Sequence, residues 1–283
     1  MDYGRSVLSH PLMVEAIEDL FIPVLVYNNK PSDAATLKRF NEPSWNNPVV
    51  RYFDSNLKDV TPRKDGTWKI NQVAAQMVNA LQGARQNVPR YLLELAADAS
   101  KQQTATFAMH CYWEGEGKLG SIDGVSDTIS AWVGNLEVVR VQYDPQAVQY
   151  ADLVETAQSF ECASKVFAES KTQLTTARRL VGNSAESLKS KPRNAKLSDQ
   201  KYYLRNTPYL RSLPLTRFQS TKINASLKQK TDFRTWLSPR QLQLLERLIQ
   251  SKDGDALKFR FPENDALLPE YHERLLRLLP GTQ

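Results

Sequence analysis

Cysteine is scarce in this sequence: Cys111 and Cys162 are the only two among 283 residues. A secreted domain held together by disulfides usually carries more cysteines than this. Two cysteines cannot by themselves supply the four ligands of a structural zinc site, and three scattered histidines add little. Redox or nucleophilic chemistry is the remaining special use of the thiols. The alternative is that both are buried and pack as small apolar side chains.

Long apolar runs are absent as well. No stretch approaches the roughly 20 apolar residues that a helix needs to cross a bilayer. The residues after Met1 contain no apolar core of the kind found in a secretory signal peptide. We therefore expect no membrane partner and a cytoplasmic location, unless a signal lies upstream of Met1.

Positive charge is unevenly distributed. Residues 186 to 234 contain twelve Lys or Arg against three acids, a balance of +9, so the rest of the chain carries −3 of the net +6. Such a segment can contact acidic partners or phosphates, although a charged run is more commonly a solvated surface. A non-enzymatic binding module that uses this basic segment is one alternative for the function, with nucleic acid an unlikely partner.

The first half of the chain alternates helices and strands. The pattern of apolar residues predicts a helix over 11–21, a buried parallel strand over 22–27, a strand over 49–53 and a helix over 70–82. This order resembles the latter part of a thioredoxin-like domain, over residues 5 to 85. The Cys-x-x-Cys pair that such a domain places ahead of its first helix is missing.

The second half begins with a strand and continues with mixed elements. We expect strands over 104–109 and 136–143, and helices over 112–121, 150–159, 164–190, 198–206, 214–229, from Ser238-Pro239 onward, and over 265–279.

An ordered set of motifs runs from residue 106 to residue 153. It consists of Phe107-Ala108, Cys111-Tyr112-Trp113, Glu116, Gly124-Val125, Thr128, Glu137-Val138-Val139, Tyr143-Asp144-Pro145 and Tyr150-x-x-Leu153. This set resembles the catalytic core of the A-type peptide methionine sulfoxide reductases. A weaker likeness over Ser198 to Leu204 extends the resemblance to residues 104–206.

The resemblance implies a catalytic pair and a resolving thiol. Cys111 is the expected nucleophile, because a helix beginning at that point lowers the pKa of a thiol. Glu137 is the expected acid that protonates the sulfoxide oxygen. Cys162 is the natural resolving thiol, which would convert a sulfenic acid at Cys111 to a disulfide. The alternative for Cys162 is a buried structural residue.

The resemblance also implies a substrate-binding wall. Tyr112 and Trp113 would grip the methyl group of the substrate, and Tyr203, or its neighbour Tyr202, would reach the site from the segment around Ser198. The alternative for these two tyrosines is a surface helix with aromatic anchors. His110 stands where the family has glycine, and it either replaces a lost polarising group or is simply a packed histidine.

The chain departs from the family pattern at several points. The loop from Ile129 to Leu136 is shorter than the family's, and Asn135 replaces a histidine. The family's His-Asp-Pro is absent, and Ser159 to Cys162 stand near its place.

These observations predict an α/β protein. Its first part, 1–95, is a partial thioredoxin-like domain without Cys-x-x-Cys. A methionine sulfoxide reductase-like α+β sandwich follows over 103–235, and a helical C-terminal extension occupies 236–283.

The expected function is thiol-dependent reduction of methionine sulfoxide, free or in a peptide, or of a related oxidised sulfur, by Cys111. We expect no bound cofactor or metal and electrons from a thiol reductant such as thioredoxin. A general thiol redox or peroxide-reducing protein with a divergent site is the second enzymatic alternative.

Overall fold

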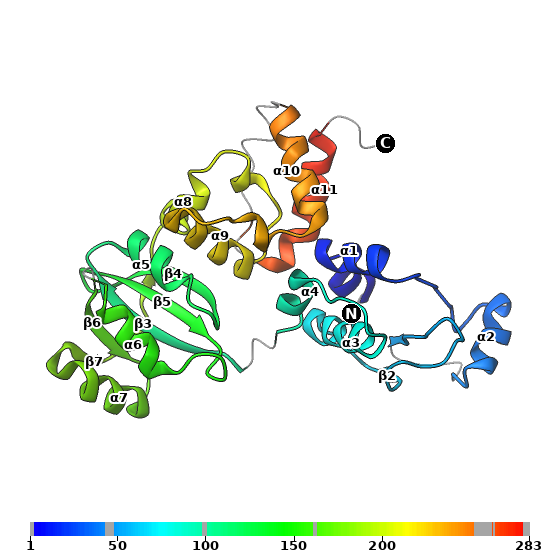
Figure 1. Cartoon of the computed structure of the whole chain (residues 1–283), viewed down its shortest axis with the longest axis horizontal. Helices are drawn as coiled ribbons and strands as arrows, with labels where there is room; N and C mark the ends of the chain where they lie inside the picture. Colours follow the sequence, from blue (N-terminus) through cyan, green and yellow to red (C-terminus); the bar gives the residue numbers. More distant parts are fainter. Residues whose placement is uncertain are drawn as a thin grey trace. The chain divides into compact units, whose positions relative to one another are not determined.

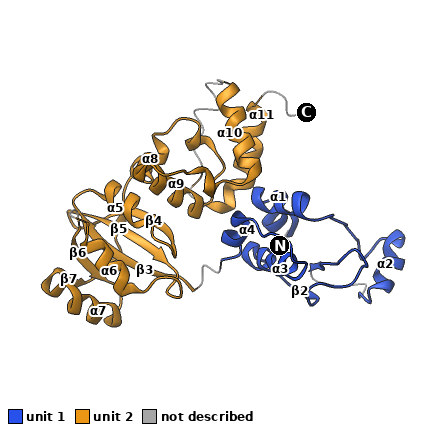
Figure 2. Cartoon of the chain, in the orientation of Figure 1, with its two compact units in different colours: residues 1–98 blue, residues 99–283 orange. Residues whose placement is uncertain are grey.

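The computed structural model describes residues 3–42, 48–97, 101–160, 163–251, 262 and 264–279. The chain divides into two compact units, residues 1–98 and 99–283 (Figure 2). Figure 1 labels most of the α-helices and strands of both units. Among the described residues, no helix combines the length and the apolar character that a bilayer crossing requires.

Unit 1 is built around helices. The helices are η1 (Gly4–Leu8), α1 (Pro11–Leu20), α2 (Ala34–Arg39), α3 (Ile70–Gly83) and α4 (Arg90–Leu95). Pro11 fits the first turn of α1 because that position needs no backbone donor. The apolar faces of α1, α3 and α4 meet in one core that includes Met13, Met77 and Leu92. Two short antiparallel strands, β1 (Val49–Val50) and β2 (Lys64–Asp65), complete the unit.

The expected buried strand over 22–27 is wrong. These residues form no strand, and Ile22, Val24 and Leu25 are 93%, 79% and 72% exposed. A continuous apolar run forms a buried strand only where neighbouring strands and helices cover it. Among the described strands, none pairs with residues 22–27. The expected strand over 49–53 shortens to β1. The thioredoxin-like identity of unit 1 stays a prediction.

Unit 2 contains a six-stranded sheet in the order β7-β6-β3-β5-β4-β8. The strands are β3 (Gln103–Met109), β4 (Val125–Val133), β5 (Leu136–Tyr143), β6 (Ala163–Ala168), β7 (Ala185–Ser187) and β8 (Arg193–Asn194). All neighbours are antiparallel except β6 and β7, which are parallel. The expected strand over 136–143 is confirmed with the same bounds, and that over 104–109 begins one residue earlier.

One face of this sheet forms the main core. Phe107 lies opposite Val139 on β5 and opposite Val166 on β6, so the three side chains share a face. They pack with Leu153 and Ala177 of helices α6 (Tyr150–Gln158) and α7 (Lys171–Val181). Helix α5 (Tyr112–Leu119) contributes Leu119 to the same core. The helices therefore cover the face of the sheet that carries these alternate residues.

Two sequence expectations in unit 2 need correction. Residues 164–190 are not one helix, because β6 and β7 flank α7. Ile129 to Leu136 is not a loop, because most of it is β4, which turns directly into β5 at Gly134-Asn135. Gly134 has a φ of 58°, which suits a tight hairpin turn.

The last helices share a second core. They are α8 (Tyr202–Arg205), α9 (Arg217–Gln229), α10 (Pro239–Ser251) and α11 (Leu268–Leu278). Their apolar faces meet around Leu204, Ile223, Leu248 and Leu275. The expected helix over 198–206 shortens to α8, whereas the others form near their expected bounds. The predicted domain ranges 1–95, 103–235 and 236–283 stay predictions.

Candidate functional site

Cys111 lies at the junction between a strand and a helix. Strand β3 ends at Met109, and Cys111 is the N-cap of α5, with an extended backbone (φ −145°, ψ 113°). Its carbonyl accepts a hydrogen bond from Gly115 N at 3.2 Å, and its side chain is a free, half-buried thiol. A residue in this position faces the N–H groups that the first turn of a helix leaves without partners.

Helix α5 packs unusually close to its neighbours. A Cβ atom added at Gly115 would lie 2.8 Å from Met109 Cγ and 2.9 Å from Val139 Cγ2. One added at Gly117 would lie 2.5 Å from Lys228 Cγ of α9. Gly115 therefore lets α5 lie directly on β3 and β5, and Gly117 lets it lie directly on α9.

Glu137 is bonded to the residue that follows Cys111. Its Oε2 accepts a hydrogen bond from Tyr112 N at 2.8 Å. The carboxyl group therefore accepts a hydrogen bond from one of the N–H groups that the first turn of α5 leaves without an intrahelical partner, at the residue next to Cys111. Glu137 is half-buried, and among the described residues its side chain accepts no other hydrogen bond. The structure thus brings together the two residues that the sequence paired, although they are 26 positions apart.

Aromatic rings surround this pair. Trp113 stacks on Tyr202, with centroids 4.1 Å apart and planes 17° apart. Tyr112 makes edge contacts with Trp113 and with Trp132, at 6.0 and 5.7 Å between centroids. The Tyr112 hydroxyl donates to Asp199 Oδ2 at 3.2 Å. Burial first, and then the charge of Asp199, raise the pKa of Tyr112 to about 12.

Tyr203 lies within electrostatic reach of the thiol. Burial raises the pKa of Tyr203, Lys228 offsets part of that rise, and electrostatic interactions with Glu114 and Cys111 add to it. Its ring makes an edge contact with Tyr202, and Lys228 Nζ lies 5.6 Å from its centroid. The sequence offered Tyr203 or its neighbour Tyr202 for the wall, and the ring that stacks on Trp113 is that of Tyr202. Two adjacent tyrosines give no local signal for choosing between them.

The remaining two predicted site residues have different outcomes. His110 is exposed at the end of β3, so the alternative of a packed histidine is wrong. Cys162 lies outside the described residues, and its role as a resolving thiol stays a prediction.

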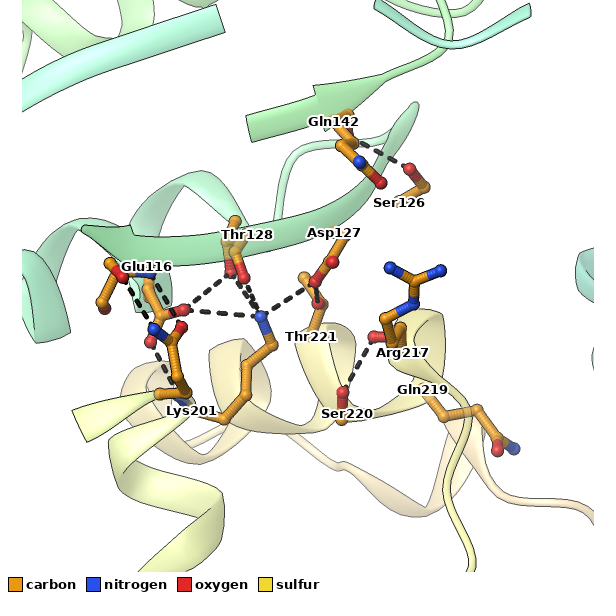
Figure 3. Close-up of polar contacts among 12 residues, drawn as sticks. Glu116, Ser126, Asp127, Thr128, Gln142, Lys201, Arg217, Gln219, Ser220 and Thr221 are labelled. Atoms are coloured by element: carbon orange, nitrogen blue, oxygen red, sulfur yellow. Dashed lines mark hydrogen bonds and ion pairs between the residues drawn. The ribbon is translucent and has the colours of Figure 1, made fainter. Parts of the chain in front are cut away.

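Sequence reasoning missed a buried charge cluster behind the site (Figure 3). Lys201 Nζ lies 3.0 Å from Asp127 Oδ1 and 3.4 Å from Glu116 Oε1, and it also donates to the carbonyl and hydroxyl of Thr128. Thr221 of α9 donates to the same Asp127 oxygen at 3.0 Å. This cluster connects α5, β4 and α9 with the segment before α8.

The charges of this cluster depend on one another. Burial lowers the pKa of Lys201, but attraction to Asp127 and Glu116 outweighs burial, so its pKa is raised and the ammonium persists. Burial raises the pKa of Glu116, and Lys201 only partly offsets that rise. Nothing local in the sequence distinguishes Lys201 from the other lysines of the basic segment.

Three consecutive residues attach the segment before α8 to the rest of the site. Asp199 accepts from Tyr112, and Lys201 joins the buried cluster. Between them, the Gln200 side chain accepts from Ser130 N at 2.9 Å and donates to Ser130 O at 2.7 Å, as a neighbouring strand would. These bonds hold Tyr202 and Tyr203 beside Trp113 and Cys111.

The basic segment 186–234 is not a continuous charged surface. Lys201, Arg205 and Lys222 are buried, and Lys222 Nζ donates to the carbonyls of Gly120 and Ile122 at 2.9 and 2.7 Å. Part of the excess positive charge therefore stabilises the interior rather than facing a partner.

Comparisons with known proteins support part of this picture. No protein-family model matches the chain. It is 38% identical over 77 residues to "Peptide methionine sulfoxide reductase MsrA 2" of Rhizobium meliloti (strain 1021), covering 22% of this chain and 39% of that protein. It is 29% identical over 79 residues to "Peptide methionine sulfoxide reductase MsrA 1" of Nostoc sp. (strain PCC 7120 / SAG 25.82 / UTEX 2576), covering 22% of this chain and 48% of that protein. The chain thus spans less than half the length of these curated relatives, and the matches leave the rest of it unaddressed.

Proposed function

We propose that this protein reduces methionine sulfoxide, free or in a peptide, or a related oxidised sulfur, because one segment of the chain is similar to two peptide methionine sulfoxide reductases. Cys111 is the nucleophile. The observation that carries the proposal is the 2.8 Å bond from Tyr112 N to Glu137 Oε2, which holds a carboxyl group beside the N-cap thiol.

The reaction transfers one oxygen atom. The Cys111 thiolate attacks the sulfoxide sulfur while the Glu137 carboxyl gives a proton to the sulfoxide oxygen. The attack forms a sulfur–sulfur bond, and the sulfur–oxygen bond of the substrate breaks as the protonated oxygen leaves as hydroxide. Hydroxide then attacks the Cys111 sulfur, which forms the sulfenic acid and breaks the sulfur–sulfur bond, so that the sulfide leaves. The sulfur of Cys111 loses two electrons and the substrate sulfur gains two. The thiol's proton replaces the one that Glu137 gave, so no net proton is taken up.

The aromatic residues provide the substrate site. The half-buried Trp113, backed by Tyr202, offers an apolar surface for the methyl group, and Tyr112 and Tyr203 border it. The Tyr112 hydroxyl already donates to Asp199, so it is held in place rather than free to reach the substrate oxygen.

The enzyme must then be returned to its thiol form. Cys162 attacks the sulfenic acid, releasing water and forming a disulfide with Cys111. An external dithiol such as thioredoxin reduces that disulfide and is itself oxidised. The proposed cycle requires no bound cofactor.

The test measures methionine formed from free methionine sulfoxide with dithiothreitol as reductant. We expect turnover by the full chain, and its loss in Cys111→Ser. The matched control is Cys162→Ser, which should still form one methionine per chain in the absence of reductant. Full activity in Cys111→Ser would refute the proposal. Turnover of hydrogen peroxide but not of methionine sulfoxide would favour the general thiol peroxide-reducing alternative.

A further inference from the structure

A row of three side chains crosses the sheet beside the candidate site. Glu137 of β5 is the direct ladder partner of Trp132 on β4, and Trp132 is the direct partner of Arg193 on β8. Directly opposed residues point to the same face of a sheet. Arg193 therefore stands on the same face as Glu137, at the edge strand.

The side-chain contacts agree with this register. The Arg193 guanidinium carbon lies 5.9 Å from the centroid of Trp132, and the Trp132 ring lies 5.7 Å from that of Tyr112. The guanidinium is thus linked to the residue next to Cys111 through two ring contacts. Contact with an aromatic ring also orients an arginine at little further entropic cost on binding.

Arg193 is available to a ligand. It is exposed, and among the described residues no carboxylate or hydrogen-bond acceptor pairs with its side chain. A guanidinium is always charged and binds a carboxylate through two parallel hydrogen bonds. The acid nearest to it in the sheet row is Glu137, which already accepts from Tyr112.

We propose that Arg193 is a specificity-determining residue that selects substrates with a carboxylate close to the methionine sulfoxide. Two strand spacings of about 4.8 Å place Arg193 roughly 10 Å from Glu137. An extended peptide advances about 3.3 Å per residue, so this separation corresponds to about three residues of substrate. The preferred substrate is an acidic peptide segment with Asp or Glu within about three residues of the oxidised methionine. This inference depends on the proposed function.

The experiment compares two peptides that differ only in charge. One is acetyl-Asp-Asp-Gly-Met(O)-Gly-Asp-Asp-amide, and the other has Asn in place of each Asp. The ratio of their kcat/KM values, with dithiothreitol as reductant, is measured for the full chain at low salt. We expect a preference for the acidic peptide of about fivefold, typical of a solvent-accessible charge-assisted contact, which shrinks as salt screens it.

Variants assign the preference to one residue. Arg193→Gln should bring the ratio close to one, and Arg193→Lys, which keeps the charge but loses the planar fork, should retain part of it. The matched control is Lys189→Gln. Lys189 is an exposed cation of the same basic segment, but it follows β7 at the opposite edge of the sheet. We expect it to leave the ratio unchanged.

The outcomes separate the two proposals. Equal turnover of both peptides by the unmodified chain, or an unchanged ratio in Arg193→Gln, overturns the role of Arg193 while the proposed reductase activity stands. Absence of Cys111-dependent turnover with free methionine sulfoxide overturns the proposed function, and this inference with it.

Discussion

Replacing Lys201 by methionine tests whether the buried cluster holds the site together. Methionine fills similar volume but removes the ammonium that lies between Glu116 and Asp127. Lys201 is 6% exposed and Glu116 is fully buried, so water cannot replace the lost partner without opening the structure. The substitution leaves two buried carboxyl groups that repel each other, with no cation between them to neutralise their charges.

The magnitude follows from this burial. Removing one partner of a buried ion pair costs about 3 to 5 kcal/mol, because the charge left behind is neither solvated nor neutralised. With a urea dependence of about 2 kcal/mol per molar, the unfolding midpoint should fall by roughly 1.5 to 2.5 M. Part of the loss should return in Lys201→Met/Glu116→Gln, since one of the two carboxyl charges is then absent.

The assay is urea unfolding of the full chain, followed by tryptophan fluorescence, with hydrogen exchange measured by mass spectrometry to assign the change to residues 99–283. Lys196→Met is the matched control, because Lys196 is exposed, and its free energy of unfolding should change by less than about 0.5 kcal/mol. The loss in Lys201→Met should also be smaller at pH 5 than at pH 8, because burial raises the pKa of Glu116 and its protonation removes one of the two negative charges. A urea unfolding midpoint for Lys201→Met that lies within about 0.3 M of that of the unmodified chain would refute the reasoning.

Four further predictions concern single residues. Glu137→Gln keeps an oxygen that can accept from Tyr112 N, so the fold should persist while kcat falls by about 10²- to 10⁴-fold, the usual contribution of a general acid; an unchanged kcat would exclude that role. Trp113→Ala should raise KM more than Trp113→Phe, as steady-state kinetics on free methionine sulfoxide will show, and equal effects would argue against an apolar wall. Ultraviolet titration should show tyrosine ionisation at about pH 12 that decreases by one residue in Tyr112→Phe. Because the folded pKa of Tyr112 exceeds the unfolded value of about 10, its contribution to stability is lost as pH rises from 10 towards 12. Burial lowers the pKa of His272 below its ordinary value, so its uptake of a proton on unfolding should reduce stability as pH falls below about 6.5, and His272→Gln should flatten that dependence in urea titrations between pH 5 and 7.

The sequence predicted elements best where one face of a strand is buried. Strand β5 has the expected bounds because its alternation reflects a face covered by helices, as the burial of Val139, Val141 and Tyr143 shows. The run over 22–27 is as apolar as β5. Whether such a run is buried depends on which other elements of the fold cover it, and the local pattern of residues does not contain that information. Within 164–190 the sequence predicted the helix but not β6 and β7, because these strands are short and flank that helix closely.

The candidate site was predictable only in part, for a similar reason. The nearness of Cys111 and Glu137 follows from a motif order that resembles a known family. The burial of Lys201 depends on Asp127 and Glu116, which lie 74 and 85 positions earlier in the chain. The place of Arg193 depends on a two-residue strand that pairs with β4. Neither contact leaves a periodic signal in the sequence.

The most direct test of the central claim is a single-turnover experiment with Cys162→Ser and no reductant. The full-length variant is mixed with free methionine sulfoxide, and dimedone, which traps sulfenic acids, is added before peptide mass spectrometry. The account predicts one methionine per chain and one dimedone adduct, at Cys111, with neither product formed in Cys111→Ser/Cys162→Ser. Methionine formed without an adduct at Cys111, or in equal amount by the double variant, would contradict it.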